Sequence, residues 1–489
     1  MINIFVDEKN LEYDIYALLK AFYPKEDILV KTAEKGHNNA DEKESGGVPS
    51  FYDVHFDVEN VYCSYTDNGC ELFREEETHG GTDKGDLKNA MKRCIYRTAA
   101  KVTGNELPWG TLTGIRPVKL AMNMICEGRS CSDIYDFLKN TYYVSDEKIR
   151  LATDIAGREK GILECIDAKN GYSLYIGIPF CPTTCLYCSF TSYPIAKWRK
   201  RVSEYLTCLK KEIDLVRVLY KGKTPDTIYI GGGTPTTLEP EQLRELIGYL
   251  NASFNMNDVI EFTVEAGRPD SITAEKLKTL KELGVSRISV NPQTMNDETL
   301  KVIGRRHTVG DVKKAFALAR ECGFDNINTD VILGLPGEDL VHIKHTMDEI
   351  RLLAPDSLTV HSMAIKRAAG MDEYLKEHTE LKSINTPDML DMAASTADEL
   401  SMKPYYLYRQ KNMTGNFENV GYAREGCYGI YNILIMEEVQ SIIACGAGTV
   451  SKRVFNNGRI ERCDNVKDVE LYMLRLDEML ERKRTLFGD

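Results

Sequence analysis

The sequence lacks several features that mark other classes of protein. Its 489 residues contain no apolar run long enough to cross a membrane, no run rich in lysine or arginine, and no basic start followed by an apolar segment. Acidic residues outnumber basic ones, 74 to 62, so the net charge of −12 gives a nucleic-acid partner no electrostatic support. We therefore predict a cytoplasmic protein that binds neither membrane nor nucleic acid.

Cysteine, in contrast, is plentiful. The 14 cysteines are spread along a chain without a secretory signal, which is typical of a reducing compartment and disfavours a disulfide framework. Three of them form Cys181-Pro-Thr-Thr-Cys185-Leu-Tyr-Cys188. A structural zinc site closes with four Cys or His ligands, and neither a second pair nor a nearby His follows this loop. Three thiolates instead suit three corners of an iron–sulfur cube, whose fourth iron is open to a ligand that is not protein.

The patterning of the chain predicts four parts. Residues 1–105 mix strand and helix signals, including the hairpin signal Asn68-Gly69, and predict an α+β module. Residues 106–170 predict a helical connector. From 171 to 369, apolar runs of strand length alternate with amphipathic helices, as in parallel βα units. Residues 370–489 predict a region that caps one end of the resulting barrel and its substrate.

The predicted fold class is α/β, with a partial (β/α)6 barrel of the TIM-like kind at its centre. Six βα units are visible, two fewer than a full barrel contains. The six strands are predicted at 173–178, 226–230, 260–265, 287–290, 326–333 and 357–361.

Polar groups recur at the carboxyl ends of these strands, where βα barrels place their active groups. The three-cysteine loop follows the first strand, and Gly231-Gly-Gly-Thr-Pro235 follows the second without the Lys-Ser/Thr of a phosphate-binding loop. Glu265 ends the third strand, Gln293 follows the fourth and Asp330 lies in the fifth. A plain turn also explains the glycines, and a solvated strand end explains any one polar group equally well. Their recurrence favours a common ligand.

The motifs resemble those of the radical S-adenosylmethionine (SAM) superfamily over residues 172–451. The three-cysteine loop and the Gly-Gly-Gly-Thr-Pro segment one βα unit later carry this resemblance. The segments around Tyr175, Gln293 and Asp330 resemble the oxygen-independent coproporphyrinogen III oxidase (dehydrogenase) family. The segment Leu107-Pro-Trp-Gly-Thr-Leu-Thr-Gly-Ile-Arg-Pro117 resembles the branch of that family with an extended amino-terminal module.

The resemblance implies two cofactors, a [4Fe-4S] cluster and SAM. It makes Cys181, Cys185 and Cys188 the cluster ligands and places Tyr175, as the catalytic-site residue, near the cluster and the sulfonium. The SAM contacts that it implies are Tyr187 beside the adenine, Gly232, Gly233 and Thr234 toward the methionine and adenine, Glu265 at the amino group, Arg305 at the carboxylate, Gln293 and Asp330 at the ribose, and the backbone of Ala364 at the adenine.

The resemblance also implies a reaction. In the family, a 5′-deoxyadenosyl radical takes hydrogen from a propionate of coproporphyrinogen III, and loss of carbon dioxide and one electron leaves a vinyl group. The expected partners are a tetrapyrrole and a flavodoxin-like or ferredoxin-like electron donor. Two positions depart from related patterns: Phe190 stands where these enzymes carry a fourth Cys, and Tyr431-Asn432 stands where a haem-chaperone branch carries His-Asn. A haem-binding chaperone and another tetrapyrrole-acting radical enzyme are the alternatives.

Overall fold

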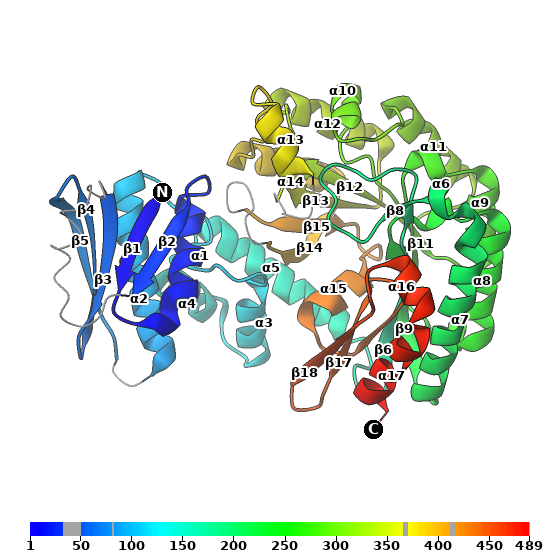
Figure 1. Ribbon diagram of the computed structural model, residues 1–489, viewed down its shortest axis with the longest axis horizontal. Helices are drawn as coiled ribbons and strands as arrows, with labels where there is room; N and C mark the ends of the chain where they lie inside the picture. The colour runs from blue at the N-terminus through cyan, green and yellow to red at the C-terminus, as the bar shows by residue number, and fades with distance from the viewer. Residues whose placement is uncertain (33–49, 81–82, 365–369, 411–416, 489) are drawn as a thin grey trace. The chain divides into compact units, whose positions relative to one another are not determined.

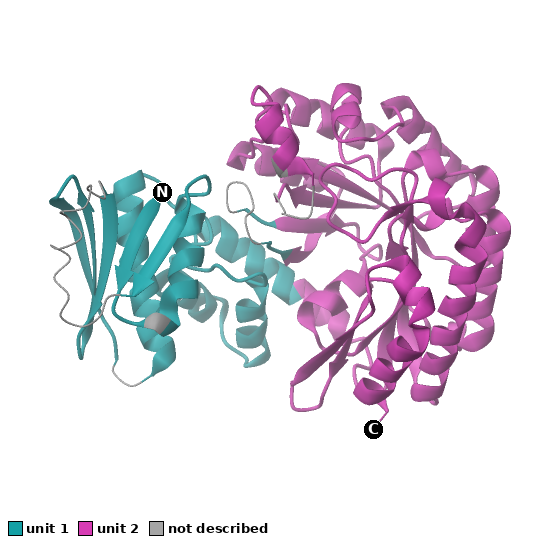
Figure 2. Ribbon diagram, viewed as in Figure 1, with its two compact units in different colours: residues 1–157, 408–418 teal, residues 158–407, 419–489 magenta. Residues whose placement is uncertain are grey.

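The protein forms two compact units (Figures 1 and 2). The computed structural model describes residues 1–32, 50–80, 83–364, 370–410 and 417–488. Unit 1 comprises residues 1–157 and 408–418, and unit 2 comprises 158–407 and 419–489. The predicted connector at 106–170 is therefore divided between the two units, and the four-part division stays a prediction. No helix in the described ranges combines the length and apolar character needed to cross a membrane.

Unit 1 contains a five-stranded sheet in the order β2-β1-β3-β4-β5. Asn68-Gly69 joins the antiparallel strands β4 and β5, and the φ angles of these two residues are 48° and 81°. This confirms the predicted hairpin, because Asn-Gly favours the left-handed backbone that a two-residue turn requires. The strands are β1 (Ile2–Val6), β2 (Ile28–Thr32), β3 (Ser50–Phe56), β4 (Asn60–Asp67) and β5 (Cys70–Thr78). The helices are α1 (Glu12–Phe22), α2 (Lys84–Thr103), α3 (Val118–Cys126), α4 (Cys131–Tyr142) and α5 (Asp146–Leu163), which runs into unit 2.

Unit 2 is built on six parallel strands in the order β13-β12-β11-β10-β9-β6. These are β6 (Gly171–Ile178), β9 (Thr224–Gly232), β10 (Glu261–Gly267), β11 (Arg287–Val290), β12 (Ile327–Leu333) and β13 (Ser357–Ser362). All six predicted strands are confirmed, and so is the α/β class. The connecting helices cover the outer face of the sheet: α7 (Val202–Leu219), α8 (Pro240–Ser253), α9 (Ala274–Glu282), α10 (Asp297–Val302), α11 (Val309–Glu321) and α12 (Leu340–Leu353).

Alternate residues of the parallel strands face two different environments. Leu174, Ile228 and Val264 are fully buried in the apolar core that the strands share with α7, α8 and α9. The neighbouring residues carry polar groups that meet across the other face, where Thr227 Oγ1 donates to Ser173 Oγ at 2.9 Å. Because side chains alternate along a strand, this second face can collect polar groups without disturbing the core. It is the face that carries the candidate site.

The carboxyl-terminal region, predicted to cap the barrel, extends the sheet at both edges. Next to β13 lie β15 (Asn419–Ala423), which is antiparallel to it, and β14 (Lys403–Tyr408). Next to β6 lie the parallel strand β16 (Ile442–Cys445) and then β17 (Val450–Val454) and β18 (Ile460–Asp464). The helices of this carboxyl-terminal region are α13 (Met371–Glu377), α14 (Pro387–Glu399), α15 (Ile430–Glu437), α16 (Val469–Leu474) and α17 (Leu476–Phe487).

Candidate functional site

The three-cysteine loop leaves the sheet directly after β6. Cys181 ends the short strand β7 (Phe180–Cys181) and is 9% exposed, while Cys185 and Cys188 are half-buried. The Cys188 N–H donates to the Cys185 carbonyl at 3.0 Å, which gives the loop a tight turn. Burial raises the pKa of the Cys181 thiol to about 11, against the opposing hydrogen bond from Thr234. This thiol therefore keeps its proton at neutral pH until a metal displaces it.

The described residues contain no group of three or more His, Cys, Asp or Glu side chains arranged around one metal ion. A cubane cluster binds each of its Cys thiolates through a different iron, so its ligands do not gather at a single point. The arrangement of the loop is compatible with a cluster held at three corners.

The glycine segment after β9 packs against the start of the cysteine loop. Gly233 N–H donates to the Ile178 carbonyl at 2.8 Å, and Thr234 N–H donates to the Phe180 carbonyl at 2.7 Å. A Cβ on Gly233 would lie 2.6 Å from the Phe180 carbonyl oxygen and 2.9 Å from Cys181 Sγ. Only glycine permits this approach, so the segment does more than turn the chain. It holds two loops of the site together.

Glu265, at the end of β10, lies beside three stacked tyrosines. Its carboxylate accepts a hydrogen bond from Tyr229 Oη at 2.6 Å and another from the backbone of Gly232. The Tyr229 ring is parallel to Tyr175 within 11° at 5.9 Å and lies 4.6 Å from the ring of Tyr431. Burial raises the pKa of Glu265 to about 7 despite the hydrogen bond from Tyr229. This carboxyl group therefore changes charge near neutral pH.

Arg305 follows α10 and reaches back to two elements of the site. Its Nη2 donates to Tyr187 Oη at 3.0 Å, and its Nη1 donates to the Asn291 carbonyl at 2.5 Å. The side chain is buried, since Arg305 is 6% exposed. The structure thus brings the predicted residues Tyr187 and Arg305 together.

Gln293 and Asp330 lie on adjacent strand ends. The Gln293 N–H donates to the Asp330 carbonyl at 3.0 Å, and Gln293 has a left-handed φ of 70°. Asn328 Nδ2 donates to the Asp330 carboxylate at 2.7 Å, and His361 Nε2 lies 3.8 Å from it. Burial alone would raise the pKa of Asp330, but His361 and Asn328 lower it below its ordinary value. Ala364 is buried just after β13.

Several buried polar atoms of this region lack a partner within the described residues. They are Gln293 Oε1, Asn291 Oδ1 and Arg305 Nε, and the three residues are at most 9% exposed. An unpaired buried polar group costs about 1–3 kcal/mol. A polar ligand with hydroxyl, amino and carboxylate groups would satisfy such atoms. These residues therefore fit the nucleoside and amino-acid groups of SAM.

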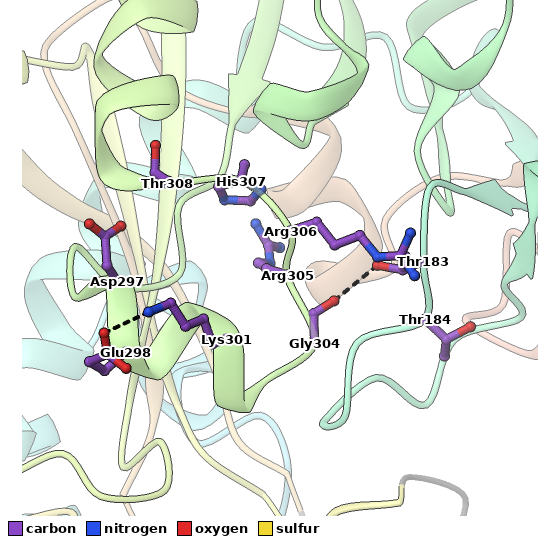
Figure 3. A pocket seen from close by; sticks show the side chains of 10 residues that line it. All are labelled: Thr183, Thr184, Asp297, Glu298, Lys301, Gly304, Arg305, Arg306, His307 and Thr308. Carbon is purple, nitrogen blue, oxygen red and sulfur yellow. Dashed lines mark hydrogen bonds and ion pairs between the residues drawn. The ribbon is translucent and has the colours of Figure 1, made fainter.

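A cavity of about 750 Å³ lies on one side of the cysteine loop (Figure 3). Thr183 and Thr184 of the loop line it together with Asp297, Glu298, Lys301 and the stretch 304–308. Thr183 Oγ1 donates to the Gly304 carbonyl at 3.0 Å across this cavity wall. Arg305 is the only predicted site residue among those that line the cavity. The cavity is therefore distinct from the group of predicted residues at the carboxyl ends of the strands.

Sequence reasoning missed four side chains of this region, which are Tyr229, Tyr431, Arg268 and His361. Tyr229 pairs in register with Tyr175 across β6 and β9, so both side chains lie on the polar face. The alternation of Tyr229 with Ile228 and Ile230 was a usable signal for Tyr229. Tyr431 joins the stack from α15, a helix far away in the sequence, and no local pattern points to it.

Comparison with known proteins agrees with this geometry. Residues 175–350 match the family model of the Radical SAM superfamily. The oxygen-independent coproporphyrinogen-III oxidase-like protein HemZ of Bacillus subtilis is 40% identical over 402 residues, which cover 81% of this chain and 80% of HemZ. The chain belongs to the HemZ family of radical SAM proteins. The cofactors of this family are a [4Fe-4S] cluster and SAM, as the cysteine loop predicts.

The chain also resembles members of two other groups over part of its length. The haem chaperone HemW of Bacillus subtilis is 44% identical over 197 residues, which cover 40% of this chain and 51% of HemW. The oxygen-independent coproporphyrinogen III oxidase of Pseudomonas aeruginosa is 32% identical over 241 residues, 49% of this chain and 52% of the oxidase. The solved coproporphyrinogen III oxidase HemN of Escherichia coli shares the fold, with a TM-score of 0.52 at 22% identity over 66% of this chain and 73% of HemN.

Proposed function

We propose that this HemZ-family protein is a coproporphyrinogen dehydrogenase of anaerobic haem and porphyrin biosynthesis. It converts two propionates of coproporphyrinogen III to vinyl groups and so forms protoporphyrinogen IX. Each propionate would lose a hydrogen atom to the radical derived from SAM, then carbon dioxide, and one electron to an external electron acceptor. The observation that supports the proposal most directly is the likeness to HemZ across 81% of the chain. The likeness to a named coproporphyrinogen III oxidase over 241 residues adds to it.

Most of the residues with proposed roles lie at or just after the carboxyl ends of the parallel strands. Cys181, Cys185 and Cys188 hold the cluster, and the bound cofactors supply a one-electron cleavage that generates a carbon radical. The protein's own contribution is to position SAM and the substrate and to exclude water.

The SAM contacts carry over as proposals residue by residue. Glu265 would accept from the amino group, Arg305 would hold the carboxylate, and Gln293 and Asp330 would meet the ribose hydroxyls. The remaining contacts, with adenine or the methionine moiety, are those of Tyr187, Gly232, Gly233, Thr234 and the backbone of Ala364.

The tyrosine stack favours an enzyme over a haem carrier. Tyr431 stands where a haem-chaperone branch carries its histidine, and it is 6% exposed and packed face to face against Tyr229. Burial raises the pKa of Tyr431, so its hydroxyl stays protonated and is a poor iron ligand. The stack instead gives Tyr175 a rigid place near the cysteine loop, where it acts as the catalytic-site residue of the proposal.

Phe190 is the position that distinguishes this chain from enzymes with a fourth cysteine. Its side chain lies two residues after Cys188 and is 73% exposed. An exposed aromatic ring so close to the loop suits contact with a large apolar macrocycle. We propose that Phe190 packs against the tetrapyrrole and that the fourth cysteine is dispensable here.

The partners of the reaction are also proposed. All 14 cysteines lie in the described part of the chain and none is paired in a disulfide, which suits a reducing cytoplasm. A flavodoxin-like or ferredoxin-like protein would deliver the electron. The net charge of −12 argues against a nucleic-acid partner, and we propose no membrane partner.

The test is an anoxic incubation of the reconstituted protein with SAM, a reductant and coproporphyrinogen III. We expect methionine, 5′-deoxyadenosine and protoporphyrinogen IX, with two SAM molecules consumed for each product molecule. Cleavage of SAM with the porphyrinogen unchanged would contradict the proposal. The likeness to HemW supports haem delivery as the second candidate, and stoichiometric haem binding without decarboxylation would establish it. A modified haem product would indicate a different tetrapyrrole-acting enzyme.

A further inference from the structure

A buried arginine, Arg268, contacts the cysteine loop. Arg268 follows β10 and is 3% exposed. Its Nη1 donates to the Thr183 carbonyl at 3.0 Å, to Thr183 Oγ1 at 2.7 Å and to Cys185 Sγ at 3.8 Å. One guanidinium nitrogen therefore meets both the backbone of the loop and one of its thiols.

Two further residues hold Arg268 in this place. Asp270 accepts from Arg268 Nε at 2.9 Å and from Nη2 at 2.6 Å, a bidentate pair that fixes the plane of the guanidinium. His307 is 4% exposed and lies 3.7 Å from the same carboxylate. The Thr183 hydroxyl, which also donates to the Gly304 carbonyl, anchors the loop to the segment after α10. The ion pair with Asp270 uses Nε and Nη2 of Arg268, so Nη1 faces the cysteine loop.

We propose that Arg268 is a positioning residue that orients the cysteine loop and stabilises the reduced form of the cluster. Hydrogen bonds to cluster sulfurs are among the factors that set cluster potentials. Reduction adds one electron, and so one negative charge, to the cluster and its thiolates. A donor fixed on Cys185 Sγ therefore stabilises the reduced form more than the oxidised form, which makes the potential less negative.

The proposal concerns the cluster of the family and does not depend on coproporphyrinogen as the substrate. Arg305 also interacts with Cys185, so two guanidinium groups act on that thiol. Arg305 differs in that it contacts Tyr187 and the Asn291 carbonyl rather than the backbone of the cysteine loop. Arg268 is therefore placed to couple the position of the loop backbone to the charge on the Cys185 sulfur.

The test compares three variants by redox titration of the reconstituted cluster, followed by EPR, without SAM or substrate. In Arg268→Met we expect the ratio of reduced to oxidised cluster at a fixed potential to fall about tenfold, the effect of losing one hydrogen bond to a charged group. Arg268→Lys keeps the positive charge but loses the planar guanidinium group. The ratio of reduced to oxidised cluster should therefore fall by a smaller factor. Thr183→Val keeps the contact with Cys185, so the potential stays unchanged while iron is lost faster to a chelator.

Arg306→Met is the matched control, because Arg306 is an exposed neighbour on the wall of the cavity in Figure 3. Its potential should equal that of the wild type. An unchanged potential in Arg268→Met would overturn the proposal. If Arg268→Met does not fold, an unchanged potential in Arg268→Lys overturns it equally. Because no porphyrinogen is present, a failure of the proposed activity leaves this result unaffected.

Discussion

Two buried polar regions of unit 2 differ in how completely their groups are paired. One is the network of Glu212, Lys483, Asn465 and Tyr472, which ties α17 to α7. Glu212 is fully buried and accepts from Lys483, from Asn465 Nδ2 at 2.7 Å, from Tyr472 Oη at 2.7 Å and from the Gly446 N–H at 2.7 Å. Lys483 also donates to Asn465 Oδ1 at 2.9 Å. Every charged group of this network has its partners.

The other region lies at the carboxyl ends of the parallel strands, where the hydrogen bonding of buried polar groups is incomplete. Gln293 Oε1, Asn291 Oδ1 and Arg305 Nε are buried without a partner in the described part of the chain. Complete pairing stabilises a fold, whereas unpaired buried atoms are tolerated where a ligand later satisfies them. We propose that this difference separates a structural network from a binding site, although both contain buried charges.

The largest expected effect is on the cluster itself. Replacing Cys181, Cys185 or Cys188 by alanine removes one of three ligands, so we expect iron–sulfur absorbance and reductive SAM cleavage to fall to background. Cys208→Ala is the control, because this half-buried thiol lies on α7 outside the loop. Retention of a full cluster in any loop variant would contradict the assignment of that thiol. Iron and sulfide content and absorbance after anoxic reconstitution give the measurement.

The second prediction breaks the fully paired network. Lys483→Met leaves the Glu212 charge buried without its cation, so the free energy of unfolding should fall by about 3–5 kcal/mol. Arg475→Met is the control, since its ion pair with Glu478 is exposed and worth about 0–1 kcal/mol. Urea denaturation of the apoprotein measures both. A loss below 1 kcal/mol in Lys483→Met would show that complete pairing is not what stabilises this region.

The third prediction makes the same kind of change in the strand-end region, with the opposite outcome. Gln293→Leu removes an unpaired acceptor, so the free energy of unfolding of the apoprotein should stay within about 1 kcal/mol of wild type. SAM binding should weaken about tenfold, because a hydrogen bond to the ligand is lost. Equilibrium dialysis and urea denaturation together test this. A destabilised apoprotein with unchanged SAM affinity would assign Gln293 to the structural class.

The smallest effect concerns the proton of Glu265. Its folded pKa of about 7 lies above the ordinary 4.5, so its contribution to stability is greatest below pH 4.5 and is lost as the pH rises to 7. An ionised carboxylate accepts better from an amino group, so SAM affinity should rise as the pH passes through about 7 and level off roughly one pH unit higher. Glu265→Gln should flatten both profiles. Equal pH profiles in wild type and variant would refute this role.

The sequence allowed prediction of those parts of the structure that depend on local pattern. The six strands are apolar runs of strand length that alternate with amphipathic helices, and the cysteine loop follows the first of them, so both were visible without coordinates. The strand β16 lies far along the chain and joins β6 only through long-range pairing, which no local pattern encodes.

The site residues that were not predicted also depend on contacts between segments distant in sequence. Arg268 is three residues after Glu265, yet nothing local shows that its side chain turns toward Thr183 and Cys185. Tyr431 reaches Tyr229 only because α15 packs against the sheet. The identity of strand-end residues was predictable, whereas their partners depended on elements distant in sequence.

We propose above all that a cluster held by three cysteines leaves one iron open for SAM. EPR of the reduced, reconstituted protein with and without SAM tests it most directly. We predict that SAM changes the spectrum of the wild type, because its amino and carboxylate groups bind the open iron, and that the change is weaker in Arg305→Met. A spectrum that SAM leaves unaltered at saturating concentration would contradict the account.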